Sequence, residues 1–182
     1  MTDKIRLHLG CGKRYIPGFI HIDQSTFSHI DYCGPVESLP MFGDDTVDLI
    51  YASHVLEYFD RLEVREVLAE WRRVLKVGGI LRIAVPDFAA LVEAYRRFGL
   101  DRILGPLYGR MESGGRIIYH KTVYDFDALA TVLTANGFAQ VQRYDWRETI
   151  HRDHDDYSQS YLPHLDKDKG LLISLNVEGT KI

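Results

Sequence analysis

The chain, 182 residues long, lacks several features that mark secreted and membrane proteins. It has only two cysteines, Cys11 and Cys33, which are too few for a disulfide framework, so we expect both to be free thiols. No apolar run approaches the roughly 20 residues of a membrane span. The N-terminus also lacks the apolar core of a signal peptide. We therefore predict a cytoplasmic protein without a membrane partner.

An excess of positive charge is missing too. The 22 lysines and arginines are outnumbered by 26 aspartates and glutamates, which gives a formal net charge of −4. Proteins that bind nucleic acid usually concentrate positive charge on one face, so we expect no nucleic-acid partner. The length and the 46% of hydrophobic residues predict a single globular domain over residues 1–182 and leave the oligomeric state open.

What the sequence does contain is a strand-like run that ends in a glycine turn, IRLHLGCG at residues 5–12. A second strand-like run, FIHID at residues 19–23, ends in Asp23. In a doubly wound sheet parallel strands end at the same edge, and ligands bind there. Gly10 and Gly12 would let the backbone lie against a ligand, and Asp23 could accept the two hydroxyls of a ribose. Together these features suggest a nucleoside-containing cofactor.

The glycine turn departs from the dinucleotide-binding fingerprint. That pattern has a third glycine three residues after the second and an acid about 20 residues further on. Here Tyr15 occupies the third position, and Asp23 follows Gly12 by only eleven residues. A nicotinamide-dependent oxidoreductase is therefore disfavoured. A tight turn between two core strands, without any ligand, stays an alternative.

The rest of the chain alternates strand-like and helical patterns, which predicts an α/β domain with a mostly parallel sheet. Strands are expected over residues 5–9, 19–23, 29–32, 47–52, 80–85, 138–144 and 171–177. Helices are expected over residues 60–78, 87–98 and 125–136. Each helix begins at an aspartate that can cap it and ends near a glycine. The closing strands follow one another without a helix, which suggests one antiparallel member.

Three connections are unusual. Residues 10–18 are too few for a normal crossover between parallel strands, so we expect a short turn or irregular loop there. Residues 100–124 are glycine-rich and lack sustained periodicity, and residues 150–170 are strongly polar. We predict lid-like insertions over both of these longer segments, because long loops in a domain are usually functional or disordered.

Four segments occur in the order found in a known family: LHLGCG with Asp23, VESLPMFGDDTVDLIYASHVLEYF, WRRVLKVGGILRIAVPD and YDFDALATVLTANGF. Over about residues 5–145 the chain resembles class I S-adenosylmethionine-dependent methyltransferases, in particular the small type 11 subgroup. The resemblance implies a Rossmann-like fold with a seven-stranded, mostly parallel sheet in the order 3-2-1-4-5-7-6, strand 7 being antiparallel. It also implies S-adenosylmethionine as cofactor and S-adenosylhomocysteine as product.

The resemblance also assigns roles to single residues near the cofactor. Asp23 corresponds to the acid that binds the ribose hydroxyls. The positions beside the methionine part are Gly10, Cys11 and Gly12. Those beside adenine are Val36, Glu37 and Leu39. Those after the fourth strand, near the methionine carboxylate and the methyl group, are Ser53 and His54.

The acceptor side is less marked in the sequence. His120 or His54 could act as a general base if the acceptor is a hydroxyl or a protonated amine. Asp87 can cap a helix or lie near the substrate. We place the acceptor between the two predicted lids, beside Tyr124, His151 and Tyr157. His151 also belongs to a group of histidines and aspartates, but their spacing gives no convincing ligand set, and we expect no metal.

The sequence therefore predicts methyl transfer from S-adenosylmethionine to a small polar, saccharide-like acceptor. Displacement at a sulfonium needs mainly alignment of the acceptor and exclusion of water. One alternative is a non-catalytic protein that keeps the fold and binds the cofactor. A nicotinamide-dependent oxidoreductase is the less favoured alternative.

Overall fold

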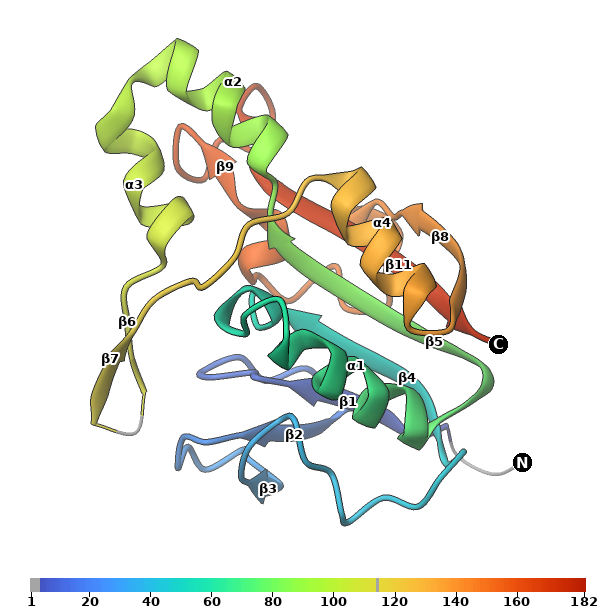
Figure 1. Cartoon of the computed structure of the whole chain (residues 1–182). Coiled ribbons are helices and arrows are strands. Elements are labelled where there is room, and N and C mark those ends of the chain that lie inside the picture. The colour runs from blue at the N-terminus through green and yellow to red at the C-terminus, as the bar shows by residue number, and fades with distance from the viewer. Residues whose placement is uncertain (1–3, 114) are drawn as a thin grey trace.

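The central sheet is built around the short strand that precedes the glycine turn. In the computed structural model, which describes residues 4–113 and 115–182, β1 (Arg6–Leu9) lies parallel to β2 (Ile20–Asp23) and β4 (Val47–Ser53) (Figure 1). On the outer sides, β3 (Tyr32–Cys33) pairs with β2 and β5 (Leu75–Pro86) pairs with β4, again in parallel.

The far side of the sheet is antiparallel. There β11 (Ser174–Lys181) runs between β5 and β8 (Phe138–Arg143) and is antiparallel to both. The resulting order is β3-β2-β1-β4-β5-β11-β8 in a seven-stranded sheet. This confirms the predicted order 3-2-1-4-5-7-6 and its antiparallel last strand.

One face of the sheet is covered by two amphipathic helices, α1 (Glu63–Val74) and α4 (Phe126–Ala135), which lie on the same side in Figure 1. Their buried side chains recur at helical spacing: Val64, Val67, Leu68, Trp71, Val74, Leu129 and Leu133. They pack on strand side chains that point to this face, such as Leu7, Ile50 and Leu81. This is the main hydrophobic core.

Within the part of the chain that the structure describes, no α-helix covers the opposite face near the first strands. Side chains alternate along a strand, so His8 and Tyr51 point to this face. The irregular segment 144–160, which includes η2 (Trp146–Glu148) and η3 (Tyr157–Gln159), packs there. Its His151 ring stacks on Tyr51 with centroids 4.0 Å apart. The short first crossover provides no helix, and this later segment covers the sheet instead of hanging over its edge as a lid.

The first long helix has the predicted capping box, but it starts at Glu63 and ends earlier than expected. The Asp60 N–H donates to Glu63 at 2.8 Å and the Glu63 N–H donates to Asp60 at 2.9 Å, which is a reciprocal capping box. The helix ends at Val74, not near Gly78, because Leu75 is already extended and starts β5. The expected strand start at residue 80 was therefore wrong by several residues.

Residues 88–123 form an arm at the end of β5. It contains α2 (Phe88–Phe98), α3 (Leu100–Tyr108) and a hairpin of β6 (Met111–Ser113) and β7 (Arg116–Ile118). Figure 1 shows the arm standing out from the sheet. The expected aperiodic loop over residues 100–124 was wrong, because α3 and the hairpin occupy much of it. The chain after the hairpin returns to the carboxyl edge of the sheet, where Tyr124 forms an isolated bridge with Asp87.

The last part of the chain is also more divided than expected. A small hairpin of β9 (Tyr161–Leu162) and β10 (Leu171–Leu172) precedes β11, so the predicted strand over residues 171–177 is two strands. Across the described ranges, no helix is long and apolar enough to cross a membrane.

Candidate active site

The glycine turn lies at the carboxyl edge of the sheet, after β1. Gly10 and Gly12 have φ of +62° and +52°, a region that favours glycine. A Cβ at Gly10 would overlap the Val55 side chain, so packing also requires glycine there. A Cβ at Gly12 would meet no atom within 4 Å. Gly10 therefore lets the turn pack against Val55 in the chain after β4. Gly12 instead faces open space in which a ligand could lie.

Asp23 is held against this turn. Its Oδ2 accepts the Gly12 N–H at 2.8 Å, and its Oδ1 accepts the Ser25 N–H at 2.7 Å. An ionised carboxylate has about four lone-pair sites, so both oxygens keep capacity for further donors. The side chain is partly exposed. The structure thus brings the predicted glycine and acid together, with the carboxylate oriented by two backbone donors.

The segment expected beside adenine is attached to α1. Trp71 Nε1 donates to the Val36 carbonyl at 2.9 Å, and the Leu39 N–H donates to Glu70 at 2.7 Å. Val36 and Leu39 have buried side chains, whereas Glu37 is exposed. Val36 and Leu39 therefore attach this segment to α1 through buried side chains and backbone hydrogen bonds, whereas the Glu37 side chain is exposed.

The two cysteines differ in environment. Cys11 is buried within the glycine turn and Cys33 is exposed, and both are free thiols as predicted. Burial is the main cause that raises the pKa of Cys11 to about 12, and the nearby Asp23 adds to it. Cys11 is therefore a neutral packing group in the turn, not a nucleophile.

A buried carboxylate lies between the two histidines that the sequence suggested as bases. Glu57, in η1 (Leu56–Tyr58), has no exposed surface. One of its oxygens, Oε1, lies 3.2 Å from His54 Nδ1 and 3.8 Å from His120 Nε2. His54 follows β4 directly, whereas His120 reaches the site on the chain that returns from the arm. We name the three residues the His54–Glu57–His120 cluster.

The environment of His120 defines its proton state. Its Nδ1 is 3.2 Å from the Leu107 carbonyl, which can only accept, so this contact places the proton on Nδ1 and the lone pair on Nε2. Burial lowers the pKa of His120, although the charge of Glu57 partly opposes the shift. His120 is therefore a neutral imidazole with its basic nitrogen directed toward a carboxylate.

Tyrosines surround the cluster. The Tyr157 ring centre is 5.3 Å from that of His54, and Tyr58 packs edge-on against His120 at 4.8 Å. The Tyr124 hydroxyl is buried without a hydrogen-bond partner among the described residues. Burial and then the charge of Glu57 raise the pKa of Tyr124 to about 12, so its hydroxyl stays protonated at neutral pH. A hollow of about 240 Å³ adjoins His120 between residues 107–108 and 121–123.

The structure separates two other residues from this cluster. The Asp87 carboxylate caps α2 by accepting the Ala89 N–H at 3.1 Å and pairs with Arg143 at 3.1 Å. His151 is fully buried against Tyr51 and Phe19, so it has no surface to offer an acceptor. We therefore leave His151 out of the acceptor site. Ser53 is also buried, and its hydroxyl has no partner within the described residues.

Glu57 is the residue that the sequence analysis missed. The signal was present: a glutamate follows the apolar pair Val55 and Leu56 just after a buried strand, where a surface charge would be out of place. Its partner His120 is distant in the chain, so no local pattern could connect them.

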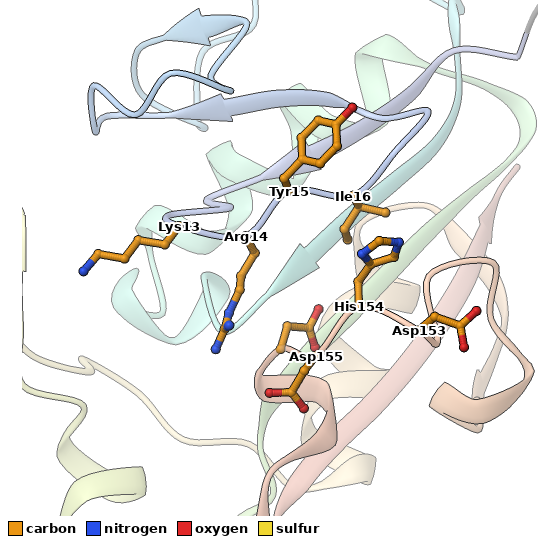
Figure 2. A pocket seen from close by; sticks show the side chains of 8 residues that line it. Lys13, Arg14, Tyr15, Ile16, Asp153, His154 and Asp155 are labelled. Atoms are coloured by element: carbon orange, nitrogen blue, oxygen red, sulfur yellow. The ribbon is translucent and has the colours of Figure 1, made fainter.

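A second hollow of about 260 Å³ lies beside the glycine turn, between residues 13–16 and 153–156 (Figure 2). Arg14 lines one wall and Asp155 the other, and Figure 2 shows the Arg14 side chain extending toward the Asp155 segment. The Asp156 carboxylate, which accepts the Tyr51 hydroxyl and the Ser158 N–H, fixes that segment to the sheet. One wall of this hollow is therefore held to the sheet by hydrogen bonds.

Comparison with known proteins gives a family for part of the chain and a fold for all of it. Residues 11–83 match a family model described as a methyltransferase domain. A search of the curated proteins found no match.

Several solved structures share the fold. A methyltransferase of Archaeoglobus fulgidus that depends on S-adenosylmethionine is 15% identical with a TM-score of 0.60, covering 99% of this chain and 87% of its own. Another, from Methanosarcina mazei, is 18% identical with a TM-score of 0.57, covering 100% and 94%. The 1,6-didemethyltoxoflavin-N1-methyltransferase of Burkholderia thailandensis, solved with bound 1,6-didemethyltoxoflavin and S-adenosylhomocysteine, is 13% identical with a TM-score of 0.57, covering 97% of this chain and 70% of its own.

Proposed function

We propose that this chain is a class I S-adenosylmethionine-dependent methyltransferase and that it methylates a small polar acceptor bound at the His54–Glu57–His120 cluster. When bound, S-adenosylmethionine supplies an activated methyl group. The protein then has to align the acceptor, exclude water and remove a proton where the acceptor carries one. The observation that supports this proposal is the buried Glu57 between two histidines at the edge where the glycine turn lies.

The residues at this edge fit the cofactor. Gly12 leaves space on its Cβ side, and Asp23 keeps acceptor capacity for two hydroxyls in a fixed orientation. We propose that Gly10, Cys11 and Gly12 contact the methionine part through backbone atoms and that Asp23 binds the ribose. Val36 and Leu39, buried against α1, would line the adenine side with Glu37 at its rim.

The cluster provides a route for a proton. His120 would accept the acceptor proton at Nε2, because Nδ1 is committed to the Leu107 carbonyl. Glu57, 3.8 Å from that nitrogen, would stabilise the imidazolium that forms. His54 contacts the same carboxylate oxygen and lies closer to the strand end, so it would orient Glu57 and contact the acceptor. Tyr124 and Tyr157 would then line the acceptor site. Asp87, which caps α2, would fix the start of that helix near the site.

We propose a saccharide-like acceptor because the site is lined by histidine and tyrosine side chains, which hydrogen-bond hydroxyls. The methyltransferase of Burkholderia thailandensis acts on a small molecule, which is consistent with a small acceptor here. The rival proposal, a cofactor-binding protein without catalysis, predicts no methyl transfer to any acceptor.

The test is a pair of measurements on the same preparations. Asp23→Ala should weaken S-adenosylhomocysteine binding in titration calorimetry by about 1.5–3 kcal/mol, the range for hydrogen bonds to a charged group. Glu57→Gln should lower turnover about a hundredfold, within the range of acid–base catalysis, and leave that affinity unchanged. Turnover is measured as the formation of S-adenosylhomocysteine from S-adenosylmethionine in the presence of a panel of monosaccharides, amines and phenols as acceptors.

The matched control is Glu66→Gln, which removes an exposed glutamate of α1. It should change neither quantity. Full turnover in Glu57→Gln would remove the cluster from catalysis, and full affinity in Asp23→Ala would remove Asp23 from the cofactor site.

A further inference from the structure

The arm, residues 88–123, holds much of the exposed apolar surface of this protein. Among the residues that the structure describes, 21 large apolar side chains are exposed, and 11 of them lie in the arm. The arm contains 36 of the 182 residues, so these side chains are far denser there than elsewhere. Single exposed apolar residues are normal, but a contiguous group of them marks an interaction surface.

Each helix of the arm has two apolar stripes. One stripe packs the two helices together, because Leu91 and Ala94 of α2 are buried in one cluster with Ile103 of α3. The other stripe is 36–55% exposed, and its residues recur every three or four positions, which places them on one face of each helix. The exposed stripes consist of Phe88, Val92 and Tyr95 in α2 and of Leu100, Leu104 and Tyr108 in α3.

The two exposed stripes lie on the same side of the arm. Figure 1 shows α2 running outward from the end of β5 and α3 running back beside it. In each helix the exposed stripe follows the packing stripe by roughly a quarter turn in the same rotational sense, at 3.6 residues per turn. Because the helices run in opposite directions, equal rotations bring both stripes to one side of the pair. The arm therefore has one broad apolar face.

The arm is also the basic part of an acidic protein. It contains six lysines and arginines and three aspartates and glutamates, a formal charge of +3. The whole chain has a formal charge of −4, so the remainder carries −7. All six basic side chains are exposed, and within the described part of the chain three of them, Arg102, Arg110 and Arg116, form no ion pair. The partner of this face should therefore be both apolar and anionic.

We propose that the apolar face of the arm docks on an anionic membrane surface, with its aromatic and aliphatic side chains among the lipid headgroups and its arginines near their phosphates. Amphipathic helices with apolar and basic faces lie in the plane of the interface in this way. The docking goes beyond the proposed function and does not depend on it. The expectation of no membrane partner came from the lack of a spanning run, which docking at the surface does not need.

The arm connects this face to the candidate active site. It starts at the end of β5 and returns through His120, and the hollow beside His120 is lined by Leu107 and Tyr108 of α3. Tyr108 thus belongs both to an exposed stripe and to the wall of the hollow. A docked arm therefore places that hollow beside the membrane surface.

A second copy of the chain is the rival occupant of the apolar face. A symmetric contact between two arms would bring two surfaces of charge +3 together, and like charges that face each other oppose association. An anionic lipid surface instead attracts the same charges. The charge of the arm therefore favours the membrane over an arm-to-arm dimer.

The test is co-sedimentation of the full-length protein with vesicles of phosphatidylcholine alone or of phosphatidylcholine mixed with phosphatidylglycerol. The protein should bind the anionic vesicles at least about tenfold more tightly, because several basic residues add to the attraction. Binding should weaken as salt is raised, since salt screens these charges. Equal binding to both kinds of vesicle would overturn the proposed anionic surface.

The first pair of variants tests the apolar face. Tyr95→Gln combined with Leu104→Gln removes one apolar side chain from each exposed stripe and should lower the affinity for anionic vesicles at least about tenfold. The matched control combines Leu62→Gln with Ile150→Gln, which removes two exposed apolar side chains outside the arm. This control should bind vesicles as the wild type does.

The second pair tests the charge. Arg110→Gln combined with Arg116→Gln should lower the affinity for anionic vesicles at least about tenfold and leave binding to neutral vesicles unchanged. The control combines Arg61→Gln with Arg65→Gln, which changes the net charge equally outside the arm and should have little effect. All these side chains are exposed, so each variant should keep the circular dichroism spectrum of the wild type.

Three results would overturn this proposal. The wild type fails to sediment with anionic vesicles, the arm variants bind as the wild type does, or the control variants lose as much affinity as the arm variants. Light scattering without lipid measures the rival occupant. A dimer that the Tyr95→Gln, Leu104→Gln variant converts to monomers, without vesicle binding, would make this face an interface between copies. None of these measurements involves cofactor or acceptor, so the proposed function is tested separately by its own titrations.

Discussion

Helices α1 and α4 close one face of the sheet with apolar side chains, whereas the irregular segment 144–160 closes the other face with histidine, tyrosine and aspartate. On the helical face Trp71 is fully buried in the main hydrophobic core. On the other face, the fully buried His151 lies on Tyr51, and Asp156 accepts the Tyr51 hydroxyl. The same sheet is thus covered by two different kinds of structure.

The difference follows from how each cover satisfies its own backbone. A helix pairs its N–H and C=O groups internally, so it can present apolar side chains alone. An irregular segment cannot, and side chains have to complete the bonding. The Gln159 amide donates to the Arg152 and His154 carbonyls at 3.3 and 3.1 Å, and Asn176 donates to the Ser158 carbonyl at 2.9 Å. Buried polar residues on this face are therefore the consequence of a missing helix.

The largest expected effect is on the helical face. Trp71→Ala should lower the free energy of unfolding by about 3–5 kcal/mol, because it empties a large fully buried site and removes the hydrogen bond to the Val36 carbonyl. His151→Ala on the polar face should cost less, about 1–3 kcal/mol, since its ring nitrogens have no partners in the described structure. Urea unfolding followed by circular dichroism measures both. Equal losses in the free energy of unfolding would mean that the two faces contribute to stability in the same way.

The next effect is a dependence on pH that comes from the buried histidines of the polar face. Burial is the main cause that lowers the pKa of His151 to about 4, and Asp156 opposes it; the pKa of His8 is also lowered well below 6.5, again mainly by burial. The unfolded chain, with histidine near pKa 6.5, therefore binds more protons between pH 6.5 and about 4. This contribution to stability is fully present above pH 6.5 and is lost as the pH falls toward 4.

At pH 5 the loss from His151 alone should be about 2 kcal/mol relative to pH 7.5, measured by urea unfolding at both values. Other groups that face these histidines are His21 with its partner Asp31, His29, Arg82 and His154. His151→Phe should flatten the dependence by that amount, whereas a variant on the helical face such as Trp71→Phe should leave it unchanged. An equally steep profile in His151→Phe would remove His151 as its source.

How much of the fold and of the site could be predicted depends on how far apart in the sequence the interacting residues are. The glycine turn, the acid at the end of β2 and the capping aspartates Asp60, Asp87 and Asp125 follow from short patterns, and the structure has each of them in place. Those patterns reflect local backbone geometry. The α3 helix was not predicted, because this short helix contains Pro106 and several of its apolar side chains are exposed. Its sequence therefore shows no periodic buried face.

The candidate site was only partly predictable for the same reason. The Gly12–Asp23 contact joins two elements that are neighbours in the sequence. The cluster instead requires the arm to return His120 to Glu57, and the polar face requires Asp156 to meet Tyr51 across 105 residues. Periodicity and composition contain no information about such pairings. Residues 150–170 therefore looked like a free polar loop, although several of their polar groups are buried.

The smallest expected effect tests whether the polar face depends on its central hydrogen bond. Tyr51→Phe keeps the ring against His8 and His151 and removes only the hydroxyl that donates to Asp156. The cost should be about 1 kcal/mol, at the low end for an unsatisfied buried acceptor, because Asp156 still accepts the Ser158 N–H at 2.8 Å. Tyr95→Phe, which removes an exposed hydroxyl from α2, is the matched control and should change stability little. Urea unfolding at pH 7.5 measures both variants. A loss in Tyr51→Phe as large as that in Trp71→Ala would mean that this one bond, and not the surrounding side chains, holds the irregular segment on the sheet.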